Sequence, residues 1–264
     1  MAKHIGIIGG SGPEAGILFA QALVDAKKQM LGRLYKTDKD APSFTLLSLP
    51  NIGGPHLPEE FTVGSTAREE LWSSLQSAIH ILAPRVDLLC IACNTLHVFE
   101  PEIRELLLKL ALENGTPCEF VSMVDATLVE IQRQGFDSVR ILGSKVTSNY
   151  STGVTLSSDT SVRSPYFNLN EAVKLVPSSS EEKEAMQKLL GLVKREGPYE
   201  ASVQRLFAEL INGSSSPCVL ACTEFDLVME AFKATPGRAA LTESRIVLPT
   251  LALAKVIIEK SSVP

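Results

Sequence analysis

The chain has 264 residues, 45% of them apolar, so it can bury a substantial core in one large domain or in two compact lobes. Lys and Arg number 25 against 30 Asp and Glu, which gives a formal net charge of −5, and the basic residues form no stripe that could follow a phosphate backbone. Nucleic acid is therefore not an expected partner. The N-terminus, MAKHIGIIGG, has no apolar segment with a small-residue cleavage site, and no run of ~18 apolar residues occurs. We expect no membrane association and a cytoplasmic protein.

Short runs rich in Ile, Val, Leu and Phe alternate with longer amphipathic stretches, which is the pattern of βα units around a parallel sheet. Strands are predicted at residues 4–9, 44–49, 86–92, 118–123, 138–143 and 217–221. Two helices are predicted because each places four apolar residues on one face: Leu71, Leu75, Ile79 and Leu82, and then Ile103, Leu106, Leu107 and Leu110.

Further helices follow from local signals. Asp125 is predicted as an N-cap, with Gly135 ending the same helix. Residues 157–170 are predicted as a surface loop, and residues 177–186 as a loop that leads into a helix with an acidic first turn. The segment LPTLALAKVIIEK, residues 248–260, is predicted as a C-terminal helix.

The sequence contains two similar halves. A β-run ending in a glycine turn occurs at IGIIGG and again at VRILGS, where Gly10 and Gly143 are 133 positions apart. A cysteine follows an apolar run at Cys93 and again at Cys222, 129 positions apart. Two landmark pairs with nearly equal spacing predict a duplicated unit.

The predicted fold class is therefore α/β, with two pseudo-symmetric α/β lobes, central parallel sheets and an active site in the cleft between the lobes. The first lobe is predicted to span residues 1–122 and the second lobe residues 123–245. A C-terminal helix, residues 246–264, is predicted to fold back onto the first lobe.

The five cysteines are an odd number in a chain expected in a reducing compartment, so structural disulfides are not predicted. Cys90 and Cys93 form a CxxC motif, which is compatible with half of a zinc site or with a redox pair. Cys90 and Cys218 lie inside apolar segments, where a free cysteine behaves as a small hydrophobic residue, and we expect both to be buried.

Cys93 and Cys222 follow predicted strands and precede predicted helices, the place where parallel-sheet proteins bind ligands. Free N–H groups and the helix dipole at such a position lower the pKa of a thiol. Asn94, Thr95 and Thr223 add hydrogen-bond donors suited to a small carboxylate. If both cysteines face one substrate carbon, one thiolate can remove a proton while the other thiol returns a proton to the opposite face. That reaction inverts the stereocentre, and it requires no cofactor and no metal.

The glycine-rich segment GGSGPEAG, residues 9–16, is neither GxGxxG nor GxxxxGK[ST], which argues against a nucleotide site. Pro13 suits the first position of a helix, so the turn before it exposes backbone N–H groups. Ser11 is therefore predicted to form a further wall of the same pocket.

The ordered motifs GIIGGSGPEAG, ACNTLH and ACTEF resemble the aspartate/glutamate racemase superfamily, whose typical forms are GGMGP, PCNTAH and GCTE. The cofactor-independent aspartate racemase branch is the most similar. The resemblance covers nearly the whole chain, since SMVDATLVEIQRQGFDSVRIL and GSKVT also look like segments of that family. It implies two pseudo-symmetric α/β lobes with the site between them, an amino-acid or dicarboxylate substrate, no cofactor, and a homodimer.

The resemblance implies roles for individual residues. Cys93 and Cys222 match the two acid/base cysteines, each of which serves one enantiomer. Six residues match substrate-binding or pocket-lining positions: Ser11, Asn94, Thr95, Thr147, Lys183 and Thr223. The match is incomplete at LPNIGGPHLP, residues 49–58, where Pro55 stands at the place of an arginine that binds the distal carboxylate. His56 is the nearby basic residue, and a histidine binds a carboxylate more weakly than a guanidinium does.

Several alternatives stay open at this point. His97 is four residues after Cys93, where it would tune the thiol or cap a helix, and Glu224 is predicted to satisfy backbone donors at a helix start. The function is predicted to be racemisation of aspartate or glutamate. The alternatives are isomerisation or decarboxylation of a small diacid by the same superfamily, a non-catalytic small-molecule binder, and a thiol redox protein using Cys90 and Cys93.

Overall fold

The computed structural model describes residues 2–54, 56–148, 162–235, 241 and 243–262 of the 264-residue chain. These residues form two four-stranded sheets, in which all strand pairs are parallel. The strand order is β2-β1-β3-β4 in the first sheet and β6-β5-β7-β8 in the second, so the two sheets repeat one topology. The predicted fold class, α/β with two lobes, is confirmed.

The strands are short, and the two central strands of each sheet are largely buried, because helices cover both faces of each sheet. The first sheet contains β1 (Ile5–Gly9), β2 (Phe44–Ser48), β3 (Leu88–Ile91) and β4 (Glu119–Phe120). The second contains β5 (Ser138–Gly143), β6 (Lys174–Leu175), β7 (Cys218–Ala221) and β8 (Ile246–Val247). All six predicted strands are present, although the one predicted at residues 118–123 covers only Glu119–Phe120, because Ser122 caps α4 and Met123 begins it. β6 and β8 were not predicted.

Eight α-helices occur in the described residues: α1 (Pro13–Leu31), α2 (Thr66–Leu82), α3 (Glu100–Asn114), α4 (Met123–Arg133), α5 (Ser180–Glu196), α6 (Ala201–Asn212), α7 (Thr223–Ala234) and α8 (Pro249–Ser262). The apolar faces predicted for α2 and α3 are buried. α5 begins after a capping box between Ser179 and Glu182, which gives the predicted acidic first turn. No helix in this described part combines the length and apolar character needed to cross a bilayer.

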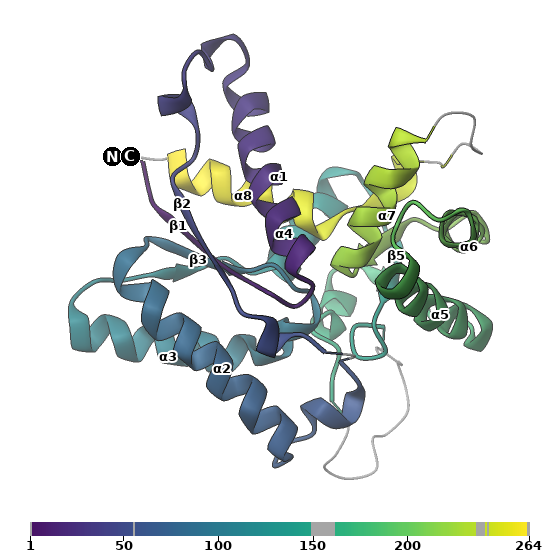
Figure 1. Cartoon of the computed structure of the whole chain (residues 1–264), viewed down its shortest axis with the longest axis horizontal. Coiled ribbons are helices and arrows are strands. Elements are labelled where there is room, and N and C mark those ends of the chain that lie inside the picture. Colours follow the sequence, from purple (N-terminus) through teal and green to yellow (C-terminus); the bar gives the residue numbers. More distant parts are fainter. Residues whose placement is uncertain (1, 55, 149–161, 236–240, 242, 263–264) are drawn as a thin grey trace.

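Each sheet lies between helices. In the first lobe, α2 and α3 cover one face and α1 and α8 the other. In the second, α5, α6 and α7 cover one face, while Val124 and Ile131 of α4 pack on the other. The last helix in sequence thus packs on the first sheet, and the two chain ends lie side by side, where Lys3 N–H bonds the Ser261 carbonyl at 3.2 Å (Figure 1). The boundary predicted near residue 122 stays a prediction.

Three local predictions were wrong. Asp125 is not the N-cap of α4: Ser122 is, and its Oγ accepts the Asp125 N–H at 3.3 Å. Residues 246 and 247 are not helical, since they pair with Cys218 and Val219 as strand β8 before Pro249 starts the helix. In the segment 157–170, predicted as a surface loop, Tyr166 is fully buried; residues 157–161 lie outside the described residues.

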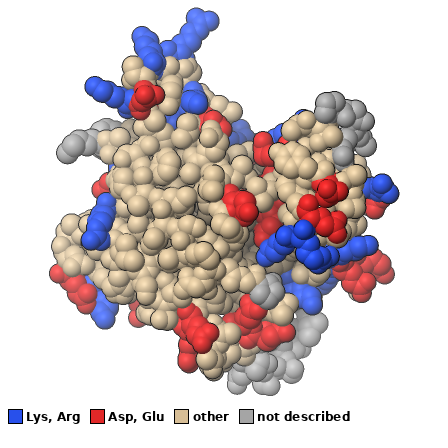
Figure 2. All heavy atoms as spheres, in the orientation of Figure 1, with Lys and Arg blue, Asp and Glu red and all other residues tan. Residues whose placement is uncertain are grey.

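On the face of the molecule shown in Figure 2, acidic and basic side chains lie mainly along the rim and on the right-hand lobe, and a broad uncharged area covers the rest. The absence of a nucleic-acid partner stays a prediction.

Candidate active site

A cavity of about 200 Å³ lies where the two lobes meet, beyond the carboxyl ends of β1, β3, β5 and β7. It is smaller than the ~300–1,000 Å³ pockets of drug-sized ligands, so it suits a small molecule. The first lobe contributes Ser11, Gly54, His56, Leu57, Cys93, Asn94 and Thr95. The second contributes Ser144, Gln187, Leu190, Gly191, Lys194, Cys222, Thr223 and Glu224. The structure therefore brings Cys93 and Cys222 into one cavity, from opposite lobes.

Cys93 stands two residues after β3 and is only 6% exposed. Its Sγ lies 3.3 Å from the Ser11 Oγ, at the turn that follows β1. Burial raises the pKa of the Cys93 thiol, but a hydrogen bond from His56 and its charge, with help from Ser11 and the Leu96 N–H, lower the pKa below its ordinary value overall. The surroundings of Cys93 therefore favour the thiolate.

Cys222 is the N-cap residue of α7, and its surroundings have the opposite polarity. Its thiol donates to Glu224 Oε2 at 2.9 Å, and Lys194 Nζ lies 3.3 Å from the other Glu224 oxygen. Burial and then the Glu224 carboxylate raise the pKa of Cys222 well above its ordinary value, outweighing the helix N–H groups. The Glu224 carboxylate therefore favours the protonated thiol of Cys222, whereas its predicted bonds to backbone donors at the helix start stay a prediction.

We expect Glu224→Gln to lower the pKa of Cys222, because a neutral amide removes the repulsion between carboxylate and thiolate while burial remains. The rate at which iodoacetamide alkylates Cys222 near pH 7 should rise on the order of tenfold. Glu230→Gln on the same helix is the matched control, since Glu230 is exposed and pairs with Lys233 at 3.7 Å. Equal Cys222 reactivity in the two variants would contradict this assignment.

The predicted carboxylate-binding residues also line the cavity. Asn94 accepts a hydrogen bond from the Tyr166 hydroxyl at its Oδ1, which leaves its amide nitrogen as a donor. Thr95 Oγ1 lies 3.0 Å from the Ser144 Oγ, so residues of the two lobes meet directly there. Thr223 is the first residue of α7, where backbone N–H groups and the dipole favour an anion.

Two predicted residues lie elsewhere. Thr147 does not line the cavity: it is fully buried behind Ser144, whose Oγ lies 3.2 Å from the Thr147 Oγ1. Lys183 lines a separate cavity with Lys145, Ser148, Glu184 and Gln187, and the two cavities share only Gln187. The cation at the cysteine cavity is Lys194, 11 positions further along α5. Eleven residues are three helical turns, so Lys183 and Lys194 share a helix face but stand about 16 Å apart.

The segment that lacks the family's arginine also reaches the cavity. Gly54, His56 and Leu57 line it, whereas Pro55 lies outside the described residues. Sequence reasoning treated His56 only as a weak substitute for an arginine, and it missed Ser144, Tyr166 and Lys194. No local pattern signals Ser144 or Tyr166, because their roles depend on contacts across the lobes. Lys194 could have been suggested by its spacing from Lys183.

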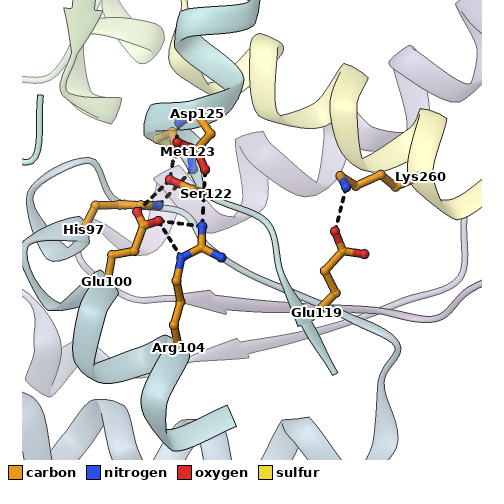
Figure 3. A network of polar contacts seen from close by, with 8 residues as sticks. All are labelled: His97, Glu100, Arg104, Glu119, Ser122, Met123, Asp125 and Lys260. Atoms are coloured by element: carbon orange, nitrogen blue, oxygen red, sulfur yellow. Dashed lines mark hydrogen bonds and ion pairs between the residues drawn. The ribbon is translucent and has the colours of Figure 1, made fainter. Parts of the chain in front are cut away.

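His97 binds backbone rather than the Cys93 thiol. Its Nδ1 donates to the Cys93 carbonyl at 2.9 Å and its Nε2 accepts the Met123 N–H at 3.0 Å, so the ring is neutral (Figure 3). Burial lowers the pKa of His97, in keeping with that state. Nearby, Ser122 donates to Glu100 and Arg104 donates to Asp125, and these two bonds tie α3 to the start of α4. His97 therefore links the backbone at Cys93 to the backbone at Met123, where α4 begins.

We expect His97→Phe to lower the free energy of unfolding by about 1–3 kcal/mol, because it leaves the buried Met123 N–H and Cys93 carbonyl without their bonds. His80→Phe is the matched control: His80 lies on the exposed side of α2, where its ring bonds only the Gln76 carbonyl of its own helix. It should change stability by less than about 0.5 kcal/mol. Urea denaturation measures both, and equal effects would exclude this role for His97.

The remaining cysteines lie away from the cavity. All five cysteines are free thiols. Cys90 and Cys93 belong to core clusters on opposite faces of the first sheet, and burial raises the pKa of Cys90. Cys90 and Cys218 are buried, as predicted. Cys90 is thus poorly placed to form a redox pair with Cys93. Among the described residues no three His, Cys, Asp or Glu side chains gather as metal ligands would.

No protein-family model and no curated protein matches this sequence. Solved structures do match. The Picrophilus torridus aspartate racemase is 21% identical, with a TM-score of 0.68 over 98% of this chain and 94% of that one. An aspartate racemase homologue from Pyrococcus horikoshii OT3 is 20% identical, with a TM-score of 0.62 over 99% and 100%. A Thermus thermophilus glutamate racemase is 15% identical, with a TM-score of 0.51 over 97% and 79%. These likenesses support the resemblance read from the sequence motifs, and they show that the chain has the fold of the Asp/Glu racemases.

Proposed function

We propose that the protein is a racemase of an acidic amino acid, aspartate or glutamate, that works without pyridoxal phosphate and uses Cys93 and Cys222 as its acid and base. The single observation that carries this proposal is the meeting of the two cysteines in one small cavity, each after a corresponding strand of the two lobes. A carbon between them can lose a proton to one sulfur and gain a proton from the other.

The neighbouring residues supply what such a reaction needs. Removing the α-proton of an amino acid moves negative charge onto its carboxylate. Asn94, Thr95, Thr223 and the N–H groups that begin α7 are donors at the cavity wall. Donors held in place before the reaction stabilise this charge as it develops, which lowers the barrier. Thr147 supports the wall through Ser144 and does not itself face the substrate.

Charge at the cavity favours an acidic substrate. Lys194 is the one lysine or arginine among the described residues that line it, and His56 lies on the first-lobe side. In this structure Lys194 bonds Glu224 and, at 3.4 Å, the Gly54 carbonyl of the other lobe. A second carboxylate on the substrate would attract the Lys194 ammonium group, which is half exposed. Lys183 would act only from the adjoining cavity.

The decisive experiment follows exchange of the α-proton. The enzyme is incubated in D₂O with L- and D-forms of aspartate, glutamate and neutral amino acids, and loss of the α-proton signal is followed by NMR together with chiral analysis. We expect deuterium incorporation and inversion with aspartate or glutamate. No exchange with any member of the panel would refute the racemase proposal.

The proposal includes a homodimer in the cytoplasm. The dimer is what the resemblance of the sequence motifs to the aspartate racemases implies, and the odd number of cysteines suits a reducing compartment. Analytical ultracentrifugation of the purified protein tests the dimer, and a single species with the mass of one chain would exclude it.

A further inference from the structure

His56 occupies an unusual position for a residue that neither removes nor returns a proton in the scheme above. It is 6% exposed at the cavity wall and has a φ of 51°, the one positive φ of a non-glycine residue among the described residues. The edge of its ring packs on Phe61, with centroids 5.6 Å apart. A left-handed backbone at a non-glycine residue is energetically unfavourable and persists only where its surroundings hold it. The fold therefore fixes this imidazole at one place beside the cavity.

The hydrogen bonds of His56 define a direction. Its Nε2 lies 3.2 Å from the Ile52 carbonyl oxygen, which can only accept, so Nε2 carries a proton. The same Nε2 lies 3.4 Å from the Ser11 Oγ, a long hydrogen bond in which the serine oxygen is then the acceptor. With Cys93 as a thiol, its Sγ donates to the Ser11 Oγ, 3.3 Å away; once Cys93 is a thiolate, the Ser11 hydroxyl can donate its proton to the sulfur instead. In the thiolate form, His56 donates to Ser11 and Ser11 donates to the Cys93 sulfur, which His56 also approaches directly.

We propose that His56 is a positioning residue that orients the Ser11 hydroxyl toward Cys93 and so makes Cys93 the thiolate of the resting enzyme, while Cys222 rests as the thiol. This assignment rests on the proposed racemase function, and it gives the resting enzyme one defined starting form. Cys93 then accepts the α-proton of one enantiomer, and Cys222 donates its proton to the opposite face. The product leaves Cys93 as a thiol and Cys222 as a thiolate, so exchange of one proton with solvent must restore the starting form.

The charges around the two sulfurs agree with this polarity. Burial lowers the pKa of His56, but the Cys93 sulfur, the Ile52 carbonyl and the Glu60 carboxylate raise it above its ordinary value overall. On the other side of the cavity, Glu224 faces Cys222 and disfavours its thiolate. Tyr166 stays a neutral phenol near both sulfurs, since burial raises its pKa. A positive partner for one thiol and a negative partner for the other separate their protonation states.

The competing role for His56 is a ligand of the substrate's distal carboxylate. The two roles differ in what the free enzyme does. A residue that orients Ser11 changes the reactivity of Cys93 before any substrate is present. A residue that only binds substrate changes KM and leaves the thiol unaffected.

Alkylation of the free enzyme by iodoacetamide separates these roles. The rates at Cys93 and Cys222 are measured from pH 5 to pH 9 by peptide mass spectrometry, in the wild type and in the His56→Gln and Ser11→Ala variants. In the wild type we expect Cys93 to react at lower pH than Cys222. Both variants should slow alkylation of Cys93 near pH 6.5 on the order of tenfold and leave the Cys222 profile unchanged. His80→Gln, at an exposed site on α2, should change neither profile.

Three results would overturn the proposal. The first is that alkylation of Cys93 in the wild type does not begin at a lower pH than alkylation of Cys222, and this test needs no variant. The second is an unchanged Cys93 profile in Ser11→Ala, which keeps His56 in place and serves if His56→Gln does not fold. The third is an unchanged profile in His56→Gln with a raised KM for aspartate, which would make His56 a substrate ligand. Alkylation requires no turnover, so its outcome is independent of whether the enzyme racemises an amino acid.

Discussion

Cys93→Ala and Cys222→Ala are each expected to lower kcat for racemisation by about 10³-fold or more, the scale on which a positioned acid or base acts. Inversion needs both a group that removes a proton and a group that returns one to the opposite face. Each variant keeps only one of them. The double variant should be little worse than either single variant, because the two sulfurs act as a unit.

The residual reactions of the single variants should differ. Cys222→Ala keeps the Cys93 base and should still exchange the α-proton of one enantiomer for deuterium without inverting it. Cys93→Ala should act on the other enantiomer, and more slowly, because Glu224 disfavours the Cys222 thiolate. NMR in D₂O with pure L- and D-substrate measures both rates.

Cys118→Ala is the control for these variants. Cys118 is half-buried against the core between the first sheet and helices α2 and α3, away from the cavity. Its substitution should leave kcat unchanged. Full racemase activity in either Cys93→Ala or Cys222→Ala would eliminate the two-thiol mechanism. Loss of activity in Cys118→Ala alone would place the chemistry elsewhere in the molecule.

The second large effect is expected on stability. Gly10→Ala should lower the free energy of unfolding by about 3 kcal/mol or more. Gly10 has a φ of 114°, and a Cβ built on it overlaps the backbone of Leu49 at its carbonyl. The Leu49 backbone cannot easily move away, because its N–H bonds the Gly9 carbonyl at 2.9 Å where β1 and β2 end. Either the turn before Ser11 must open or the pairing of the two strands must shift.

Gly64→Ala is the matched control for this substitution. Gly64 also has a positive φ, 81°, but a Cβ there meets no heavy atom within 4 Å. It should lose only about 1 kcal/mol, the cost of the backbone conformation by itself. Urea denaturation followed by circular dichroism gives both values. If the two variants lose the same stability, the close approach of Leu49 to Gly10 contributes nothing measurable.

Much of the scaffold could be predicted from the sequence because its signals are local. A buried parallel strand is a short apolar run, and an amphipathic helix repeats its apolar residues every three or four positions. These patterns gave six of the eight strands and the buried faces of α2 and α3. Strands β6 and β8 were not predicted, and their pairing depends on the neighbouring strands β5 and β7.

The site residues that could be predicted are also those with a local signal in the sequence. Cys93, Asn94, Thr95, Cys222 and Thr223 follow directly after strands, and the ends of parallel strands meet at one edge of a sheet. Ser144 and Tyr166 were missed because their role is to contact residues of the other lobe. Such contacts depend on how the two lobes pack against each other, and this packing produces no repeating pattern of residues in the sequence.

By itself, then, the sequence determined the class of fold, the two equivalent halves and the pair of cysteines, since each depends on residues close together in the chain. Only the tertiary structure decided the protonation partners of those cysteines. His56 reaches Cys93 from a loop 37 positions earlier, and Lys194 reaches Glu224 from a helix 30 positions earlier. The pKa of a buried thiol depends on the charges within a few ångströms and on its desolvation. Both are properties of the folded chain, which explains why the pKa shifts in opposite directions at the cysteines of two similar motifs, ACNT and ACTE.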